Sequence, residues 1–249
     1  MSSKSPRNSS AAPAPDAKRR RNIITATVIA LAVIGAAVLI IASSGGDSKP
    51  KASSGGSLSG TAESKQLLDG IPQQGNTLGN PKAPVTLFEY IDYQCPFCRQ
   101  FSVGPLRTLI KDYVRPGKVK IVLRPLSFIG PDSAKAARAA VGAGQQDKLW
   151  TFTELWYFNQ GQENSGYATD EFVGRIYAAA GVKAAAANAY RKTEASKRPL
   201  AAANSGAQQY AVDSTPSFVA GATGGPYAKV DADAASPDKL RAAFDGLLP

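Results

Sequence analysis

The pattern of apolar and polar positions divides the chain into a long apolar run, a polar spacer and a mixed domain. Residues 23–42 read IITATVIALAVIGAAVLIIA: they carry no charge, and only Thr25 and Thr27 are polar. As a helix this run would extend about 30 Å, which matches the hydrocarbon thickness of a bilayer. The pattern therefore predicts one N-terminal transmembrane helix over residues 23–42.

The segments on both sides of this run predict its orientation. Residues 1–22 carry six basic residues against Asp16 alone, and residues 43–60 are rich in Gly and Ser. Because basic residues favour the cytoplasmic side, we expect residues 1–22 to be a basic cytoplasmic tail and residues 43–60 to be a flexible tether. A cleaved signal peptide is the alternative, although its apolar region is usually shorter. Either interpretation exports residues 61–249, so the expected location is the cell membrane with an extracytoplasmic domain.

The mixed domain, residues 61–249, shows strand and helix patterns in a fixed order. β-branched apolar runs bounded by Pro or Gly predict strands at 84–91, 119–124, 217–220 and 227–230. Helical periodicity and capping signals predict helices at 61–68, from Cys95 to about Tyr113, at 134–143, 147–158, 169–180 and 184–195, and from Ser236 onward. This order predicts an α/β fold with a helical insertion at about 132–206.

Charge and residue types exclude several classes of function. The formal net charge is +10, but half of it lies in residues 1–22, and the rest forms no basic stripe with interleaved aromatic residues. We therefore expect no nucleic-acid partner. The chain has no histidine, which excludes Ser-His-Asp and Cys-His catalysis and His-ligated metals. Its two cysteines are too few for a four-thiolate metal site, so the chemistry is expected to depend on these two sulfurs.

The two cysteines form the motif Cys95-Pro96-Phe97-Cys98 between a predicted strand and a predicted helix. A cysteine at a helix N-terminus faces free backbone N–H groups and the positive end of the helix dipole, which stabilise the thiolate and lower the thiol pKa. Pro96 suits the first helical position because it has no N–H to satisfy. We expect Cys95 to be the exchanging nucleophile and Cys98 the resolving thiol. A static disulfide or half of an intermolecular metal site is the alternative, but so short a disulfide loop adds little stability.

Further candidates follow from their position relative to this motif. Thr215 and Pro216 lead into the third predicted strand, either as a simple strand start or as a cis-proline loop that faces the cysteines. Glu89 shares one face of the first strand with apolar residues, so its carboxyl is expected beneath the motif, where it could relay protons. An exposed surface Glu is the alternative reading of that position, and Asp92 is a rival for the same role.

Five segments in combination resemble the DsbA-like thiol:disulfide oxidoreductases of the thioredoxin superfamily: FEYIDYQCPFCRQF, VLRPL, DKLWTFTELWYFNQ, GYATDEF and STPSFVAG. The likeness covers about residues 70–249 and is greatest to the membrane-anchored extracytoplasmic members of actinobacteria. It implies a thioredoxin-like fold whose two halves are separated by an inserted helical subdomain. It also implies a catalytic set of Cys95, Cys98 and Glu89, with Pro216, Thr215, Pro96 and Phe97 contacting the substrate.

The resemblance further implies an activity and its partners. The expected activity is disulfide exchange with exported proteins that carry free thiols, without a metal or a cofactor beyond the Cys95–Cys98 disulfide. A quinone-linked membrane protein of the DsbB or vitamin-K-epoxide-reductase type would recycle this pair. Phe97 stands where well-studied oxidases carry His, and it can neither donate a hydrogen bond nor hold a charge. The sequence thus indicates an extracytoplasmic oxidase, with a reductase or isomerase, or a non-catalytic binding module, as the alternatives.

Overall fold

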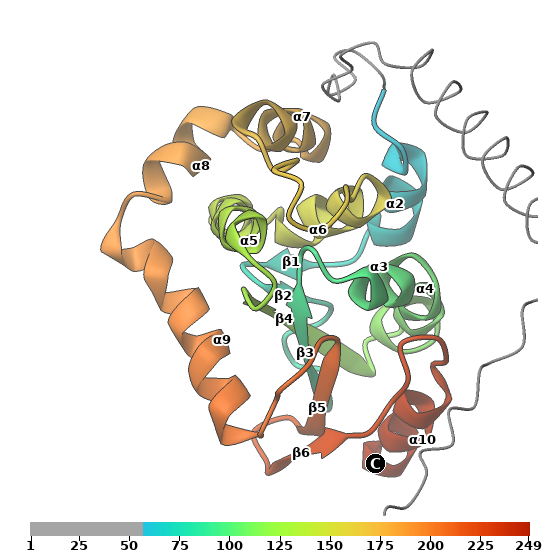
Figure 1. Ribbon diagram of the computed structural model, residues 1–249. Coiled ribbons are helices and arrows are strands. Elements are labelled where there is room, and N and C mark those ends of the chain that lie inside the picture. Colours follow the sequence, from blue (N-terminus) through green and yellow to red (C-terminus); the bar gives the residue numbers. More distant parts are fainter. Residues whose placement is uncertain (1–56) are drawn as a thin grey trace, which may run out of the picture. The chain divides into compact units, whose positions relative to one another are not determined.

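The computed structural model describes residues 57–249, in which helices cover both faces of a six-stranded sheet (Figure 1). The expected basic tail (1–22), the expected transmembrane helix (23–42) and most of the expected tether lie outside the described residues. Within residues 57–249, no helix is both long and apolar enough to cross a membrane.

The sheet has the strand order β1-β2-β4-β3-β5-β6. Its centre is β3 (Val85–Asp92), which runs parallel to β4 (Val119–Leu126) and antiparallel to β5 (Ser217–Ala222). The edges are β6 (Tyr227–Val230), antiparallel to β5, and the short hairpin of β1 (Gln73–Gln74) and β2 (Thr77–Leu78) beside β4. The central strand is thus buried between two long neighbours, which suits its nearly continuous apolar sequence.

The helices fall into three groups along the chain. The first group is α2 (Thr61–Leu68), α3 (Pro96–Val103), α4 (Pro105–Leu109) and the π-helical turn η1 (Ile110–Val114). An inserted group follows β4: α5 (Pro131–Gly144), α6 (Leu149–Phe158), α7 (Asp170–Ala180), α8 (Ala184–Tyr190), the 3-10 turn η2 (Glu194–Ser196) and α9 (Lys197–Gln209). The last helix is α10 (Asp238–Leu247).

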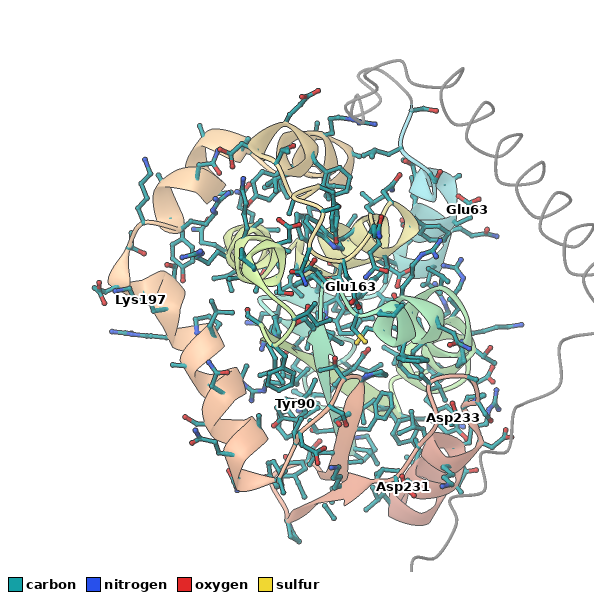
Figure 2. The ribbon with its side chains drawn as sticks, viewed as in Figure 1. Glu63, Tyr90, Glu163, Lys197, Asp231 and Asp233 are labelled. Carbon is teal, nitrogen blue, oxygen red and sulfur yellow. The ribbon has the colours of Figure 1, made fainter. Side chains whose placement is uncertain are left out.

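The two faces of β3 belong to different cores. Val85, Leu87 and Ile91 lie in the large core, together with buried residues of α3, α6 and α10. Tyr90 lies in a smaller core with Ala203 and other residues of α9, which runs along the opposite face of the sheet (Figures 1 and 2). Because strand side chains alternate between faces, this arrangement directs Glu89 toward α3 and α6.

Most of the predicted architecture is confirmed. The four predicted strands are present as β3 to β6, and the helical insertion occupies residues 131–209 between β4 and β5. The helix predicted from Thr169 is α7, and the Thr169 side chain caps it by accepting the Phe172 N–H. The fold class is therefore α/β with inserted helices, as the sequence indicates.

The single helix predicted from Cys95 to Tyr113 is wrong. The chain forms α3, then turns at Gly104 and continues as α4 and η1. Pro105 explains the break, because it has no N–H for the helix ladder and its ring clashes with the carbonyl four residues earlier.

Two elements were not predicted from the sequence. The sequence predicts that Pro199 follows a helix that ends near residue 195, whereas it is the third residue of α9. In the first turn of a helix a backbone N–H has no intrahelical acceptor, so a proline there costs no hydrogen bond. The hairpin of β1 and β2 escapes a search for apolar runs because each strand has two residues. Its turn, Gly75-Asn76, is nevertheless a recognised hairpin signal, and Gly75 has the positive φ of 59° that such turns need.

The domain also begins earlier than predicted. Ser59 was assigned to the tether, but its N–H donates to Asn159 Oδ1 at 2.9 Å and its carbonyl accepts from Asn159 Nδ2 at 2.9 Å. Leu58 packs against the large core. The Gly/Ser composition of this stretch hid one apolar residue, and its hydrogen bonds to Asn159, 100 residues away, leave no local signal in the sequence.

Two helical glycines give a matched test of the inserted helices. A Cβ at Gly142 on α5 would lie 2.9 Å from Tyr177 Oη and 3.1 Å from the Ala187 carbonyl, whereas a Cβ at Gly174 on α7 meets nothing within 4 Å. We expect Gly142→Ala to lower the free energy of unfolding by about 1–3 kcal/mol through overpacking. Gly174→Ala should raise it by about 0.5–1 kcal/mol, because alanine restricts the unfolded chain. Denaturant unfolding measures both, and equal stabilisation by the two changes would contradict this packing.

Candidate active site

Cys95 occupies the junction between β3 and α3. It is the N-cap residue of α3, and Pro96 is the first residue of that helix, as the motif predicts. The Cys98 backbone N–H donates to Cys95 Sγ at 3.4 Å, so the sulfur takes the place of a capping oxygen. Both cysteines are free thiols in the structure.

The two sulfurs have opposite acidities. A hydrogen bond from the Cys98 thiol, assisted by the Thr215 side chain and the backbone N–H groups of Phe97 and Cys98, outweighs burial and lowers the pKa of Cys95 to about 6. Burial raises the pKa of Cys98 well above its ordinary value, and the neighbouring Cys95 sulfur raises it further. At neutral pH the lowered pKa favours the thiolate of Cys95, and the raised pKa keeps Cys98 as a thiol. The roles of Cys95 as nucleophile and Cys98 as resolving thiol stay predictions.

The loop before β5 approaches the reactive sulfur. The Thr215–Pro216 peptide bond is cis, and Cys95 Sγ lies 3.1 Å from the Thr215 carbonyl oxygen, to which the protonated form of Cys95 can donate. The Ser217 hydroxyl donates to the Ser214 carbonyl at 2.8 Å and closes this loop. The structure thus brings Thr215 and Pro216 to the motif from 120 residues away in the sequence.

Phe97 is exposed beside the sulfurs. In the described part of the chain, the large hydrophobic side chains that remain exposed are Phe97, at 60%, and Phe128, at 52%. Phe128 belongs to the turn between β4 and α5, and its N–H donates to Asp92 Oδ2 at 2.8 Å. Since Asp92 ends β3 three residues before Cys95, both exposed rings flank the end of this strand.

Glu89 is the buried carboxyl that the strand pattern predicts. It is 1% exposed, and its Oε2 atom has no hydrogen-bond partner in the structure. Burial, with a smaller contribution from the charge of Glu154, raises the pKa of Glu89 to about 8. A pKa of about 8 favours the protonated form of the Glu89 carboxyl at neutral pH.

Asp92, the rival candidate, has a structural position. Its carboxylate accepts hydrogen bonds from the N–H groups of Gln94, Phe128 and Ile129 and from the Ser133 hydroxyl. These hydrogen bonds connect the end of β3 to the turn before α5 and to the first turn of α5. Both oxygens of Asp92 are thus engaged in hydrogen bonds of the fold.

The sequence interpretation missed the contribution of α6 to this site. The Gln160 amide, just after α6, donates to the Cys95 carbonyl at 3.2 Å, and the Tyr157 hydroxyl donates to the Asp92 carbonyl at 3.1 Å. Glu154 on the same helix is fully buried. One signal could have identified it: Glu154 is the only charged residue in the apolar run LWTFTELWYF. Within residues 57–249, no group of three or more Cys, Asp or Glu side chains is placed to hold a metal ion.

The buried state of Glu89 predicts a pH-dependent effect on stability. In the unfolded chain Glu89 ionises near 4.5, but in the native state its pKa is about 8. Between these pH values the native state holds a proton that the unfolded state has lost, so this group lowers the free energy of unfolding as pH rises. Glu89→Gln removes this dependence. Its free energy of unfolding, relative to that of the wild type, should therefore rise by more than about 1 kcal/mol between about pH 5 and pH 8. Denaturant unfolding at the two pH values measures the gain.

The exposed Glu63 of α2 supplies a matched control for this prediction. Glu63→Gln should leave the difference between the two pH values as it is in the wild type. Parallel stability profiles for Glu89→Gln and the wild type would show that Glu89 does not hold its proton in the native state.

Known proteins resemble this chain in sequence and in fold. The thioredoxin family matches residues 73–243, more than half of the chain. A probable disulfide bond formation protein D of Bacillus cereus is 34% identical over 99 residues, which are 39% of this chain and 46% of that protein. The match thus spans about half the length of these disulfide bond formation proteins D.

Solved structures extend the likeness to the whole described domain. Oxidised BdbD of Bacillus subtilis has a TM-score of 0.61 at 21% identity, over 71% of this chain and 96% of that chain. The thiol-disulfide exchange protein alpha-DsbA2 of Wolbachia pipientis has a TM-score of 0.56 at 22% identity, over 76% of this chain and 93% of that chain. The family match covers more than half of the chain, so the chain belongs to the thioredoxin family, and its fold is like that of the DsbA proteins.

Proposed function

We propose that this chain is an extracytoplasmic thiol:disulfide oxidase that introduces disulfides into exported proteins through Cys95 and Cys98. The observation that carries the proposal is the unequal acidity of the two sulfurs. The pKa of Cys95 is lowered to about 6, whereas that of the buried Cys98 is raised. A stabilised Cys95 thiolate favours the reduced enzyme and therefore makes the oxidised enzyme a better donor of its disulfide.

The reaction begins with the Cys95–Cys98 disulfide. A substrate thiolate attacks Cys95 Sγ, the bond between Cys95 and Cys98 breaks, and Cys98 leaves as a thiolate that takes up a proton. A second substrate thiolate then attacks the substrate sulfur of the mixed disulfide, and Cys95 leaves as a stable thiolate. Two electrons pass from the substrate to the enzyme pair, and the substrate gains one disulfide.

Glu89 is the proposed proton donor for Cys98. Cys98 is fully buried, so its proton must come from within the protein. Glu89 lies on the face of β3 that meets the helix carrying both cysteines, and it is protonated at neutral pH. It would protonate the leaving Cys98 thiolate in the forward direction and accept that proton again when the enzyme is reoxidised.

The residues around Cys95 form the proposed substrate contact. The Thr215 carbonyl lies 3.1 Å from the sulfur, so a substrate strand attached to Cys95 would lie against the backbone of Thr215 and Pro216. Pro96 and Phe97 border the sulfur on the other side, and the exposed Phe97 ring offers apolar contact to an unfolded chain. Such contact fits substrates that have not yet buried their apolar side chains.

Location and recycling complete the proposal. The apolar run at 23–42 and the basic residues before it support a membrane anchor with the domain outside the cytoplasm. A quinone-linked membrane protein of the DsbB or vitamin-K-epoxide-reductase type is the proposed oxidant of the reduced pair. Phe97 favours the alternative of a reductase or isomerase, because it gives the Cys95 thiolate neither a charge nor a hydrogen bond.

Trapping of mixed disulfides tests the proposal. A Cys98→Ala chain keeps the nucleophile but cannot resolve its adducts, so with a reduced, unfolded, cysteine-containing protein and an oxidant it should accumulate a covalent complex. The wild type should instead release oxidised substrate, and Cys95→Ala should form neither product. Non-reducing electrophoresis and mass spectrometry measure these species. Absence of both adduct and oxidised substrate would identify an inert scaffold and overturn the enzyme function.

A further inference from the structure

Arg124 on β4 is a partly buried cation that the proposed reaction does not use. Its side chain lies on the face of the sheet that packs against α9, because Leu126, two residues later on the same strand, belongs to the smaller core. The Nε atom is closed to solvent and has no hydrogen-bond partner. Among residues 57–249, the guanidinium makes no hydrogen bond or ion pair at all. A cation removed from water without a partner is costly, so its surroundings indicate what it binds.

The groups around Arg124 are aromatic and leave its donors free. Its guanidinium carbon lies over the Phe88 ring, 4.9 Å from the ring centroid. Such a contact uses one face of the guanidinium, whereas its five N–H donors lie in the guanidinium plane. Tyr90 and Tyr210 also lie near this charge, but a phenol is neutral at neutral pH and supplies no counter-charge. The described chain thus holds the cation in place without pairing it.

Arg124 lines a cleft where α5, α9 and the turn of the β1–β2 hairpin meet beside β4 (Figure 1). The cleft has a volume of about 390 Å³, and small-molecule sites occupy about 300–1,000 Å³. No Asp or Glu among residues 57–249 lines it. Apolar side chains from α5, α6 and α9 form part of its wall: Val141, Leu149, Pro199 and Ala202.

A second arginine, Arg198, reaches the same cleft from α9. It is the second residue of that helix, it is exposed, and it has no hydrogen bond or ion pair within residues 57–249. The first turn of α9 carries no acid, and the positive end of a helix dipole favours anions over cations. Arg198 is therefore unfavourably placed unless an anion lies beside it.

The acids of the neighbouring segments are engaged elsewhere. Asp147 Oδ1 accepts the Gly75 N–H of the hairpin turn at 2.7 Å. Glu194 pairs at 2.6 Å with Lys197, which is labelled at the outer edge of the molecule in Figure 2. Neither carboxylate forms an ion pair with the two arginines of the cleft. The cleft consequently presents two positive charges that the described chain does not neutralise.

We infer that this cleft binds a small amphiphilic anion, whose carboxylate or phosphate head is held by Arg124 and Arg198. The planar N–H fork of arginine matches the paired oxygens of both kinds of head group. The apolar part of the ligand would lie against Val141, Leu149 and Ala202. This site is independent of the proposed function, because both cysteines lie in the large core, whereas Arg124 lies on the opposite face of the sheet.

Another cleft supplies a matched control. Arg138 on α5 lines a cleft of about 460 Å³ that also carries Asp170 on its wall. Like Arg198, Arg138 is exposed and has no hydrogen bond or ion pair within the described residues. Arg138→Gln therefore removes the same charge from the same group of inserted helices, but it does not touch the proposed site.

Calorimetric titration of the full chain tests the inference. The probes are hexyl phosphate and hexanoate, with hexan-1-ol as the neutral match and inorganic phosphate as the head group alone. The wild type should bind one equivalent of an amphiphilic anion, and the tighter of the two probes identifies the head group. Arg124→Gln and Arg198→Gln should each raise the dissociation constant about tenfold or more, because each removes charge-assisted hydrogen bonds. Arg138→Gln should leave it unchanged.

Two further readouts locate the ligand and guard against a misfolded variant. The bound anion should shift the backbone amide NMR signals of Gly75, Gln145 and Ala202 with the same saturation curve as the heat. It should also raise the unfolding temperature of the wild type, because it binds the native state alone. Arg198→Gln should lose both effects, and since Arg198 is exposed, this variant is expected to fold even where Arg124→Gln does not.

The contrary results are equally specific. Absence of saturable binding of both amphiphiles to the folded wild type would overturn the site. Equal weakening by Arg138→Gln and Arg198→Gln would show general attraction of anions to a basic surface and would overturn it too. Equal affinity for hexan-1-ol would exclude recognition by the arginines, and equal affinity for inorganic phosphate would exclude the apolar contact.

Discussion

The structure depends on the cap that Cys95 Sγ forms at the N-terminus of α3. Such positions usually carry an oxygen, which accepts a backbone N–H and so lowers the cost of starting a helix. Here a sulfur accepts the Cys98 N–H, and the same geometry that begins the helix also stabilises a negative charge on that sulfur. β3 fixes the position because it is paired on both sides, with β4 and with β5. The helix cap therefore adds to the stabilisation of the Cys95 thiolate, of which the largest part comes from the Cys98 thiol.

The inserted helices complete the site as well as cover it. Trp156 and Tyr157 of α6, and Gln160 just after it, donate hydrogen bonds to backbone carbonyls between residues 92 and 95. These bonds hold the junction between β3 and α3 in place. It also supplies the buried Glu154, whose carboxylate accepts from the Ser102 hydroxyl and pairs with Arg107. The two buried carboxyls, Glu89 and Glu154, oppose stability at neutral pH.

Much of this could be predicted from the sequence, and the remainder has physical reasons. The strands, the Cys95-Pro96-Phe97-Cys98 cap and the inward direction of Glu89 follow from local patterns: period-two alternation, a proline at a helix start, and cysteine spacing. The break at Pro105 and the helix over Pro199 were misjudged because the effect of proline depends on its position within the turn. The contacts of Thr215 and Glu154 with the site depend on chain crossings of 120 and 52 residues, which no local pattern contains.

The reduction potential of the Cys95–Cys98 pair tests the central claim, that a stabilised Cys95 thiolate makes this domain a donor of disulfides. The full chain would be equilibrated in glutathione buffers of known ratio, and the oxidised fraction measured by mass spectrometry after thiol alkylation. The account predicts a potential between about −120 and −180 mV, in the range of known disulfide donors. A potential near about −270 mV would contradict it, because such a pair retains its disulfide too firmly to donate it and acts as a reductant.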